Sequence, residues 1–152
     1  EYKDINPLIV GVLKGVFIFM GDLAKYLKID CEFDFMAASS YGKKAKSDGV
    51  VFIEKNVTIP VKNRDVILVE DIIDSGSTLD KLKRMLIDEG AKSVRICTLL
   101  NKPSRRTIDV DVDYIGYEIE DAFIVGYGLD YDEKYRNLPY IGFLNPEIYE
   151  NN

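Results

Sequence analysis

The segment at residues 66–78, VILVEDIIDSGST, constrains the fold of this chain more than any other stretch of the sequence. Its apolar run is typical of a strand that is buried on both faces of a parallel sheet. The small residues after the run open an amphipathic stretch. A helix start leaves backbone N–H groups unpaired, and small side chains let a phosphate approach them. The segment therefore predicts a buried strand and then a phosphate-binding loop, made of Ser75, Gly76, Ser77 and Thr78.

A helix cap is the simpler interpretation of the same loop, with Asp74 or Ser77 as the capping side chain. A cap leaves three neighbouring carboxylates unexplained, those of Glu70, Asp71 and Asp74. Glu70 and Asp71 fall at the carboxyl end of the predicted strand, where open α/β sheets bind their ligands. Adjacent residues point to opposite faces of a strand, so we expect one or both to bind ribose hydroxyls, with a shared Mg²⁺, rather than to chelate one ion together.

Strands and helices alternate along the first two thirds of the chain. Apolar runs predict strands at residues 8–13, 31–39, 65–71 and 92–100. Two stretches space their apolar residues as helices do, residues 16–27 and residues 78–90, the second closed by Gly90. This alternation predicts βαβ units and thus an α/β fold, a mostly parallel central sheet with helices on both sides.

Three other regions depart from the alternation. Residues 39–49 are polar and basic without periodicity, which predicts a mobile loop. Residues 50–55 and 56–61 predict a hairpin, in which Pro60 confines its strand to an edge. After Asn101 the pattern changes to short strands and loops, at residues 114–119, 123–128 and 140–144.

Length and charge limit what the chain can be. Its 152 residues, 47% of them hydrophobic, suffice for one well-buried core, so we expect a single domain. The net charge of −6 argues against a surface devoted to nucleic acid or anionic membrane, and no apolar stretch approaches the roughly 20 residues of a membrane span. Cys31 and Cys97 lie in apolar runs as free thiols do, which favours a cytoplasmic protein. Because the chain starts at Glu1 and soon enters an apolar strand, we expect that an N-terminal piece is missing.

The central segment resembles the phosphoribosyl-pyrophosphate motif of the type I phosphoribosyltransferases, except that Ser75 stands where a threonine often follows the aspartate. Nearly the whole chain is similar to the bacterial-type hypoxanthine-guanine phosphoribosyltransferases, through VLKG, SSYG, VEDIIDSG, KPSRR and DAFIVGYGLDYDEKYRNLPYIG. The resemblance implies the type I phosphoribosyltransferase fold with a small irregular hood. It also implies purine salvage, in which 5-phosphoribosyl 1-pyrophosphate and hypoxanthine or guanine give IMP or GMP and pyrophosphate.

The resemblance assigns roles around the purine. Asp74 matches the general base that takes the proton from N7 of the purine. Lys102 matches the donor to the 6-oxo group, and an ammonium, which only donates, suits a 6-oxopurine better than adenine. The remaining matches are Phe123, which stacks on the base, Ile124, whose carbonyl reads the base edge, and Asp130, a base or metal contact.

The resemblance also assigns the pyrophosphate contacts. Lys14 and Gly15 match a turn that meets pyrophosphate through backbone amides, with a cis peptide between Leu13 and Lys14. Arg136 matches the arginine that clamps the leaving group. Without the resemblance, Arg136 would be interpreted as an ion-paired surface residue.

The resemblance also implies a loop that closes over the site, a bound metal ion and an oligomeric assembly. Ser40 and Tyr41 match the tip of a loop that closes over the reacting centre. The implied cofactor is Mg²⁺, with Glu70, Asp71 and Asp130 as candidate ligands. The implied assembly is a homodimer or homotetramer.

Two other functions stay open at this point. A phosphoribosyltransferase-like regulator would keep the phosphate loop for sensing, but it should show a basic face, and this chain is acidic. A related enzyme could prefer xanthine or adenine, and the block around Phe123 argues against adenine more strongly than against xanthine.

Overall fold

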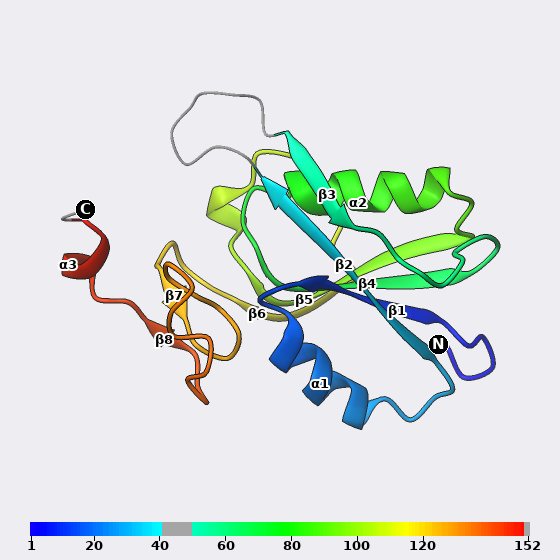
Figure 1. Cartoon of the computed structure of the whole chain (residues 1–152), viewed down its shortest axis with the longest axis horizontal. Coiled ribbons are helices and arrows are strands. Elements are labelled where there is room, and N and C mark those ends of the chain that lie inside the picture. The colour runs from blue at the N-terminus through cyan, green and yellow to red at the C-terminus, as the bar shows by residue number, and fades with distance from the viewer. Residues whose placement is uncertain (41–49, 151–152) are drawn as a thin grey trace.

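Six strands form the central sheet in the computed structural model, which describes residues 1–40 and 50–150 (Figure 1). The order across the sheet is β3-β2-β1-β4-β5-β6. β3 is antiparallel to β2, and the other neighbours are parallel. This confirms the mostly parallel α/β fold. The strands are β1 (Leu8–Leu13), β2 (Glu32–Ser40), β3 (Val51–Lys55), β4 (Asp65–Ile73), β5 (Ser93–Asn101) and β6 (Tyr114–Glu118).

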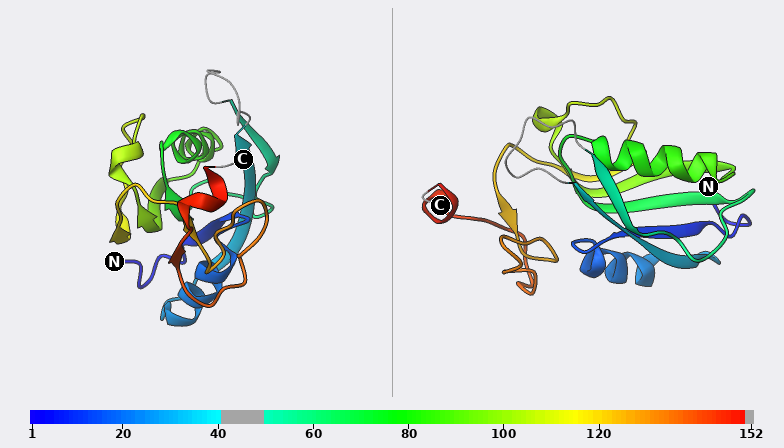
Figure 2. Two further views of the ribbon diagram at one scale, coloured as in Figure 1. Left: turned by 90° about the vertical axis from the view of Figure 1, so that its left-hand side faces the viewer. Right: turned by 45° about the horizontal axis from the view of Figure 1, so that its top comes forward.

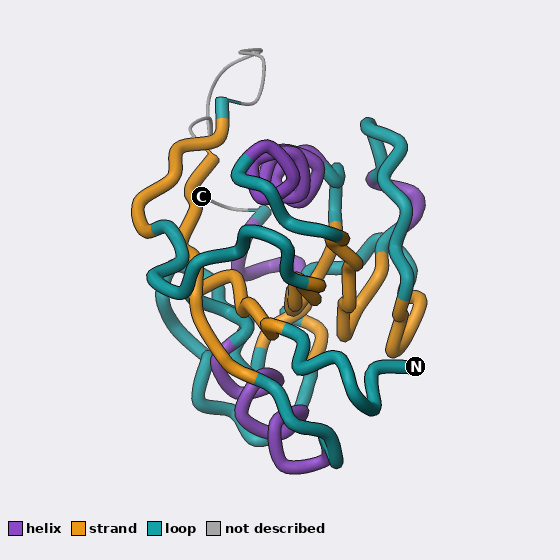
Figure 3. Tube along the Cα trace, turned by 90° about the vertical axis from the view of Figure 1, so that its right-hand side faces the viewer, coloured by secondary structure: helices purple, strands orange, loops and turns teal. Residues whose placement is uncertain are grey.

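One helix covers each face of the sheet, α1 (Phe17–Tyr26) on one side and α2 (Ser77–Asp88) on the other (Figure 3). Alternate residues of β1 face opposite helices, as the pleat of a strand requires. Leu8 belongs to the buried cluster that contains Leu82 of α2, whereas Ile9 belongs to the cluster that contains Met20 of α1. The predicted flanking of the sheet by helices is therefore confirmed.

The predicted hairpin between residues 50–55 and 56–61 is wrong. β3 pairs with β2, and residues 56–61 form no strand. The carboxylate of Asp34 in β2 accepts the backbone N–H groups of Thr58, at 2.6 Å, and Ile59, at 2.8 Å. One side chain therefore takes the donors that a strand would have used, and Pro60 has no N–H to offer.

Asp34 is expected to stabilise the fold mainly above about pH 4. Its burial raises the pKa of the carboxyl, but hydrogen bonds from the N–H groups of Ile59, Phe35 and Thr58 outweigh it and lower the pKa to about 2. Since the folded pKa lies below the ordinary value, the ionised group contributes stability at neutral pH, which is lost as the pH falls toward 2.

We therefore expect Asp34→Asn to lower the free energy of unfolding by on the order of 2 kcal/mol at pH 7 and by much less at pH 2.5. Urea denaturation at the two pH values measures the difference. The exposed Asp4 gives a matched control, because Asp4→Asn should change neither value appreciably. An equal loss at both pH values would mean that the charge of Asp34 is not what stabilises the loop.

The end of the chain forms a small separate layer at the end of the sheet (Figure 2). Here β7 (Ile124–Val125) and β8 (Gly142–Phe143) make a two-stranded antiparallel sheet, followed by the short α3 (Pro146–Tyr149). We call residues 119–150 the hood, as the resemblance implied. None of the helices in residues 1–40 and 50–150 has the length and apolar character that crossing a lipid bilayer requires.

Candidate active site

Two adjoining cavities lie at the carboxyl ends of the parallel strands, where the strand order changes direction between β1 and β4. The larger, of about 420 Å³, is lined by β1, β4, the loop into α2 and two hood residues. The smaller, of about 180 Å³, lies between the end of β4 and the hood. The residues that line both are Asp71, Ile72, Asp74 and Asp130. Ligands in the two cavities would therefore share one acidic wall.

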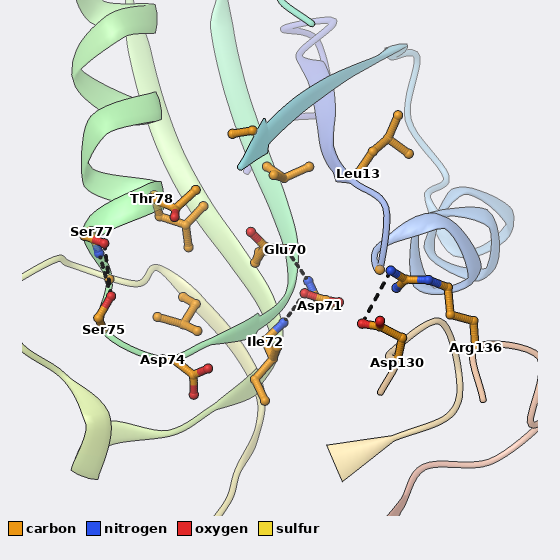
Figure 4. A pocket seen from close by; sticks show the side chains of 16 residues that line it. Leu13, Glu70, Asp71, Ile72, Asp74, Ser75, Ser77, Thr78, Asp130 and Arg136 are labelled. Atoms are coloured by element: carbon orange, nitrogen blue, oxygen red, sulfur yellow. Dashed lines mark hydrogen bonds and ion pairs between the residues drawn. The ribbon is translucent and has the colours of Figure 1, made fainter. Parts of the chain in front are cut away.

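The loop between β4 and α2 lines the larger cavity, as the sequence predicted (Figure 4). α2 begins at Ser77, and Gly76 before it has a φ of +86°, a conformation that favours glycine. Gly76 occupies the cap position, so neither Asp74 nor Ser77 is the cap residue. The N–H of Ser77 donates to Oγ of Ser75 at 3.3 Å, and the Oγ atoms of Ser75 and Ser77 lie 3.1 Å apart. These hydroxyls line the cavity at the start of the helix, a position that suits a phosphate.

The acidic pair divides its two carboxylates between the sides of β4. Figure 4 shows Glu70 pointing toward Thr78 and Asp71 pointing toward Arg136. Burial raises the pKa of Glu70 well above its ordinary value, and the neighbouring charge of Asp71 raises it further. Burial also raises the pKa of Asp71, while hydrogen bonds with the side chain of Glu70 and the N–H of Ile72 and, to a smaller extent, the positive charge of Arg136 oppose this shift. Both groups therefore favour a cation or hydroxyl donors as neighbours.

Gly15 lets the turn after β1 approach the acidic pair. A Cβ atom added at Gly15 would lie 1.8 Å from Oδ2 of Asp71, so a larger residue there requires this carboxylate or the turn to move. The peptide bond between Leu13 and Lys14 is cis, as the resemblance implied. Leu13 and Gly15 line the larger cavity, whereas Lys14 is not among the lining residues.

Arg136 reaches the larger cavity from the hood, and its side chain is only 20% exposed. Its Nη1 donates to the carbonyl of Gly128 at 2.7 Å, and its Nη2 lies 3.4 Å from Asp130 and 3.2 Å from Glu133. Within the described part of the chain, the buried Nε atom has no hydrogen-bond partner. Arg136 is therefore ion-paired through Nη2 and has one buried donor that none of the described residues satisfies.

The smaller cavity brings Lys102 and the hood residues together. Lys102 is 8% exposed, and its Nζ lies 3.7 Å from Oδ1 of Asp74. The ring of Phe123 is 37% exposed, and it meets the ring of Tyr149 at a centroid distance of 5.2 Å. Ile124 is buried and pairs with Phe143 of β8. A buried ammonium, an available aromatic face and a carboxylate thus surround one small space.

Some predicted residues are not placed in either cavity. Ser40 ends β2 opposite Val51, and Tyr41 lies outside the described residues. Glu70 and Asp71 line the larger cavity with Asp130, but no three metal-ligating side chains within residues 1–40 and 50–150 come close enough to hold an ion. The side chains alone therefore do not make a complete metal centre in this part of the chain.

Sequence reasoning did not single out two residues that contact the site. Glu133 accepts from Lys14 at 3.3 Å and from Arg136 at 3.2 Å, and so contacts two of the three predicted pyrophosphate residues. Arg106 donates to the backbone of Asp74. The motifs KPSRR and DEKYRN contain these residues, but their position beside functional residues was the only available signal.

Comparison with known proteins agrees with the fold. The family model of the phosphoribosyl transferase domain matches residues 1–132. The chain is 53% identical over 150 residues to the hypoxanthine-guanine phosphoribosyltransferase of Bacillus subtilis, and covers 83% of that protein and 99% of its own length. It is 52% identical to a bifunctional protein TilS/HprT of Listeria monocytogenes, of which it spans 23%, with 98% of its own length.

A solved structure extends the likeness to three dimensions. The crystal structure of a hypoxanthine phosphoribosyltransferase from Staphylococcus aureus has a TM-score of 0.92 and 45% identity, covering 97% of this chain and 80% of that one. The match takes in the sheet, the phosphate loop and the hood together. The chain belongs to the hypoxanthine-guanine phosphoribosyltransferase family.

Proposed function

We propose that this chain transfers the phosphoribosyl group of 5-phosphoribosyl 1-pyrophosphate to N9 of hypoxanthine or guanine, giving IMP or GMP and pyrophosphate. The proposal rests on the residues that line both cavities. Asp74 is one of them, and it lies between the phosphate loop and Lys102. The larger cavity fits a ribose phosphate with its pyrophosphate, and the smaller fits a flat base. The free thiols of Cys31 and Cys97 support a cytoplasmic setting.

Each group acts at one part of the donor and acceptor. The loop of Ser75 to Thr78 binds the 5′-phosphate, and Glu70 and Asp71 accept hydrogen bonds from the ribose hydroxyls. Arg136, which lines the larger cavity, holds the departing pyrophosphate with its guanidinium. Asp74 takes the proton from N7 as N9 attacks C1′, which places the carboxylate close to the developing positive charge of the sugar.

The donor set fits Mg²⁺ only in part. Mg²⁺ is commonly held by one or two carboxylates together with substrate oxygens and water, rather than by a full set of side chains. Glu70, Asp71 and Asp130 supply carboxylate oxygens around the larger cavity, and the ribose hydroxyls and pyrophosphate would complete the shell. When bound, the ion would neutralise charge on the leaving pyrophosphate.

Lys102 carries the base preference in this proposal. Because the ammonium only donates, it pairs with a 6-oxo group and leaves the 6-amino group of adenine without an acceptor. Its 8% exposure makes that mismatch costly, since water cannot replace the lost hydrogen bond. A xanthine-preferring enzyme remains the second candidate, because xanthine also presents a 6-oxo group.

A steady-state assay tests the proposal with the pyrophosphate donor and each of hypoxanthine, guanine, xanthine and adenine, with and without Mg²⁺. We expect kcat/KM for hypoxanthine and guanine to exceed that for adenine by at least about 10²-fold, with turnover only when Mg²⁺ is present. Turnover with none of the four bases would favour a regulator over an enzyme. A preference for adenine would disprove the role of Lys102.

The variant Lys102→Gln tests the same role more directly. Glutamine offers both a donor and an acceptor, so we expect the preference for hypoxanthine over adenine to fall by at least about tenfold. The exposed Lys92, ion-paired with Asp65, gives the control, because Lys92→Gln should leave the preference unchanged.

A further inference from the structure

Residues 101–110 run along the phosphate loop and hold its backbone, and we call this segment the strap. The N–H of Lys102 donates to the carbonyl of Ile73 at 3.0 Å. The N–H of Thr107 donates to the carbonyl of Ser75 at 3.1 Å. The strap therefore bonds to the residues on both sides of Asp74. It also contains Lys102, the lysine that is proposed to recognise the purine.

Arg106 completes this set of bonds from the strap. Its Nε donates to the carbonyl of Asp74 at 3.2 Å, its Nη2 donates to Oδ1 of Asn101, and its Nη1 lies 3.5 Å from the carbonyl of Val110. The side chain also packs under the loop, because a Cβ atom at Gly76 would lie 3.0 Å from Cδ of Arg106. Three consecutive carbonyls, that of Ile73 at the end of β4 and those of Asp74 and Ser75 after it, thus accept hydrogen bonds from one segment.

We propose that Arg106 is a positioning residue that fixes the phosphate loop relative to Lys102. It lines neither cavity, so it acts through the loop and not on a ligand. Its planar guanidinium donates in several fixed directions at once, which ties the carbonyl of Asp74 to the end of β5 at Asn101. Its assigned effect on binding of the phosphoribosyl donor rests on the proposed function.

The hydrogen bonds of Arg106 explain why another positively charged side chain would not replace it. A lysine at position 106 would keep the positive charge near the phosphate, but an ammonium on a flexible stem lacks the fixed fork of the guanidinium. Loss of the fork should loosen the loop backbone between Asp74 and Thr78. The binding of the donor phosphate should then weaken more than the binding of the purine.

The test compares Arg106→Ala, Arg106→Lys and the control Arg105→Ala. Arg105 is the adjacent arginine, but it is exposed and pairs with Asp121. For both Arg106 variants we expect KM for the phosphoribosyl donor to rise about tenfold, with KM for hypoxanthine within about twofold of the parent chain. Arg105→Ala should leave both values within about twofold.

Amide hydrogen exchange adds a readout that does not need activity. Both Arg106 variants should exchange the amides of residues 74–78 at least about tenfold faster, while Arg105→Ala should not. If Arg106→Ala folds poorly, Asn101→Ala tests the same bond from its other end and should give a smaller change of the same kind.

Three results would overturn the proposal. Parent-like donor binding in Arg106→Lys would mean that charge is sufficient, and equal changes in both KM values would indicate a merely structural role. Unchanged exchange in residues 74–78 would show that Arg106 does not order the loop. If the parent chain turns over no purine, the proposed function fails, and the exchange experiment still decides the role of Arg106.

Discussion

Asp74→Asn is expected to lower kcat by about 10²-fold or more, while nucleotide affinity stays within about tenfold. The asparagine keeps the size of the side chain but cannot take the proton from N7, and general bases typically contribute 10²- to 10⁴-fold. Asp74 is well placed for this step because it lines both cavities and its side chain is 58% exposed. Steady-state kinetics and a nucleotide titration measure the two effects separately.

The control for this change is Asp109→Asn, the same chemical substitution at an exposed residue that lines neither cavity. It should leave kcat unchanged. A second effect needs to be separated, because Asp74→Asn also removes the carboxylate 3.7 Å from Lys102. That loss should appear in KM for the base rather than in kcat. Parent-like turnover in Asp74→Asn would remove this residue from the role of base.

Gly15→Ala is the second change with a large expected effect, a fall of at least about 10²-fold in kcat/KM for the donor. The new methyl group would overlap Oδ2 of Asp71, whose Oδ1 already accepts the N–H of Ile72 at 2.7 Å. A movement of the carboxylate away from the methyl group would disturb this bond, and a displacement of about 1 Å at a reacting centre can cost 10²-fold. Kinetics at varied donor concentration measure the effect.

The matched control is Gly21→Ala, because Gly21 lies within α1 and an added Cβ would meet no atom within 4 Å. Alanine favours a helix over glycine by about 1 kcal/mol, so this variant should be active and equally or more stable. The thermal unfolding midpoint of each variant shows whether the chain is folded. A fully active Gly15→Ala variant would show that the turn and Asp71 need not approach closely.

The sequence predicted the sheet well because the relevant signals are local. The apolar runs of β1, β4 and β5 and the spacing of α2 are visible within ten or so neighbouring residues. The hairpin failed because strand pairing is not local, since the carboxylate that binds Thr58 and Ile59 belongs to Asp34, far earlier in the chain. Apolar alternation alone could not reveal that these backbone donors were already taken.

For the candidate site too, local sequence signals were sufficient for only some of the residues. The phosphate loop followed from its own small residues, whereas the purine contacts followed only from the family resemblance. Arg106 and Glu133 were missed because each works through partners distant in sequence, such as Asp74 for the first and Lys14 for the second. The roles of all the site residues, Ser40 and Tyr41 included, stay predictions.

The carboxylate of Glu133 places a negative charge of the chain itself beside the predicted pyrophosphate contacts. This carboxylate lies 3.2 Å from the guanidinium of Arg136, which the resemblance assigns to pyrophosphate, and 3.3 Å from the ammonium of Lys14, whose backbone amide is the assigned contact. Under the proposed function, an arriving pyrophosphate displaces this carboxylate from Arg136 instead of meeting a bare cation, so its net electrostatic gain is smaller. Glu133 can pair with Arg136 again when the pyrophosphate leaves. Such an exchange would help the site to release a strongly charged by-product, a step that limits turnover in many enzymes.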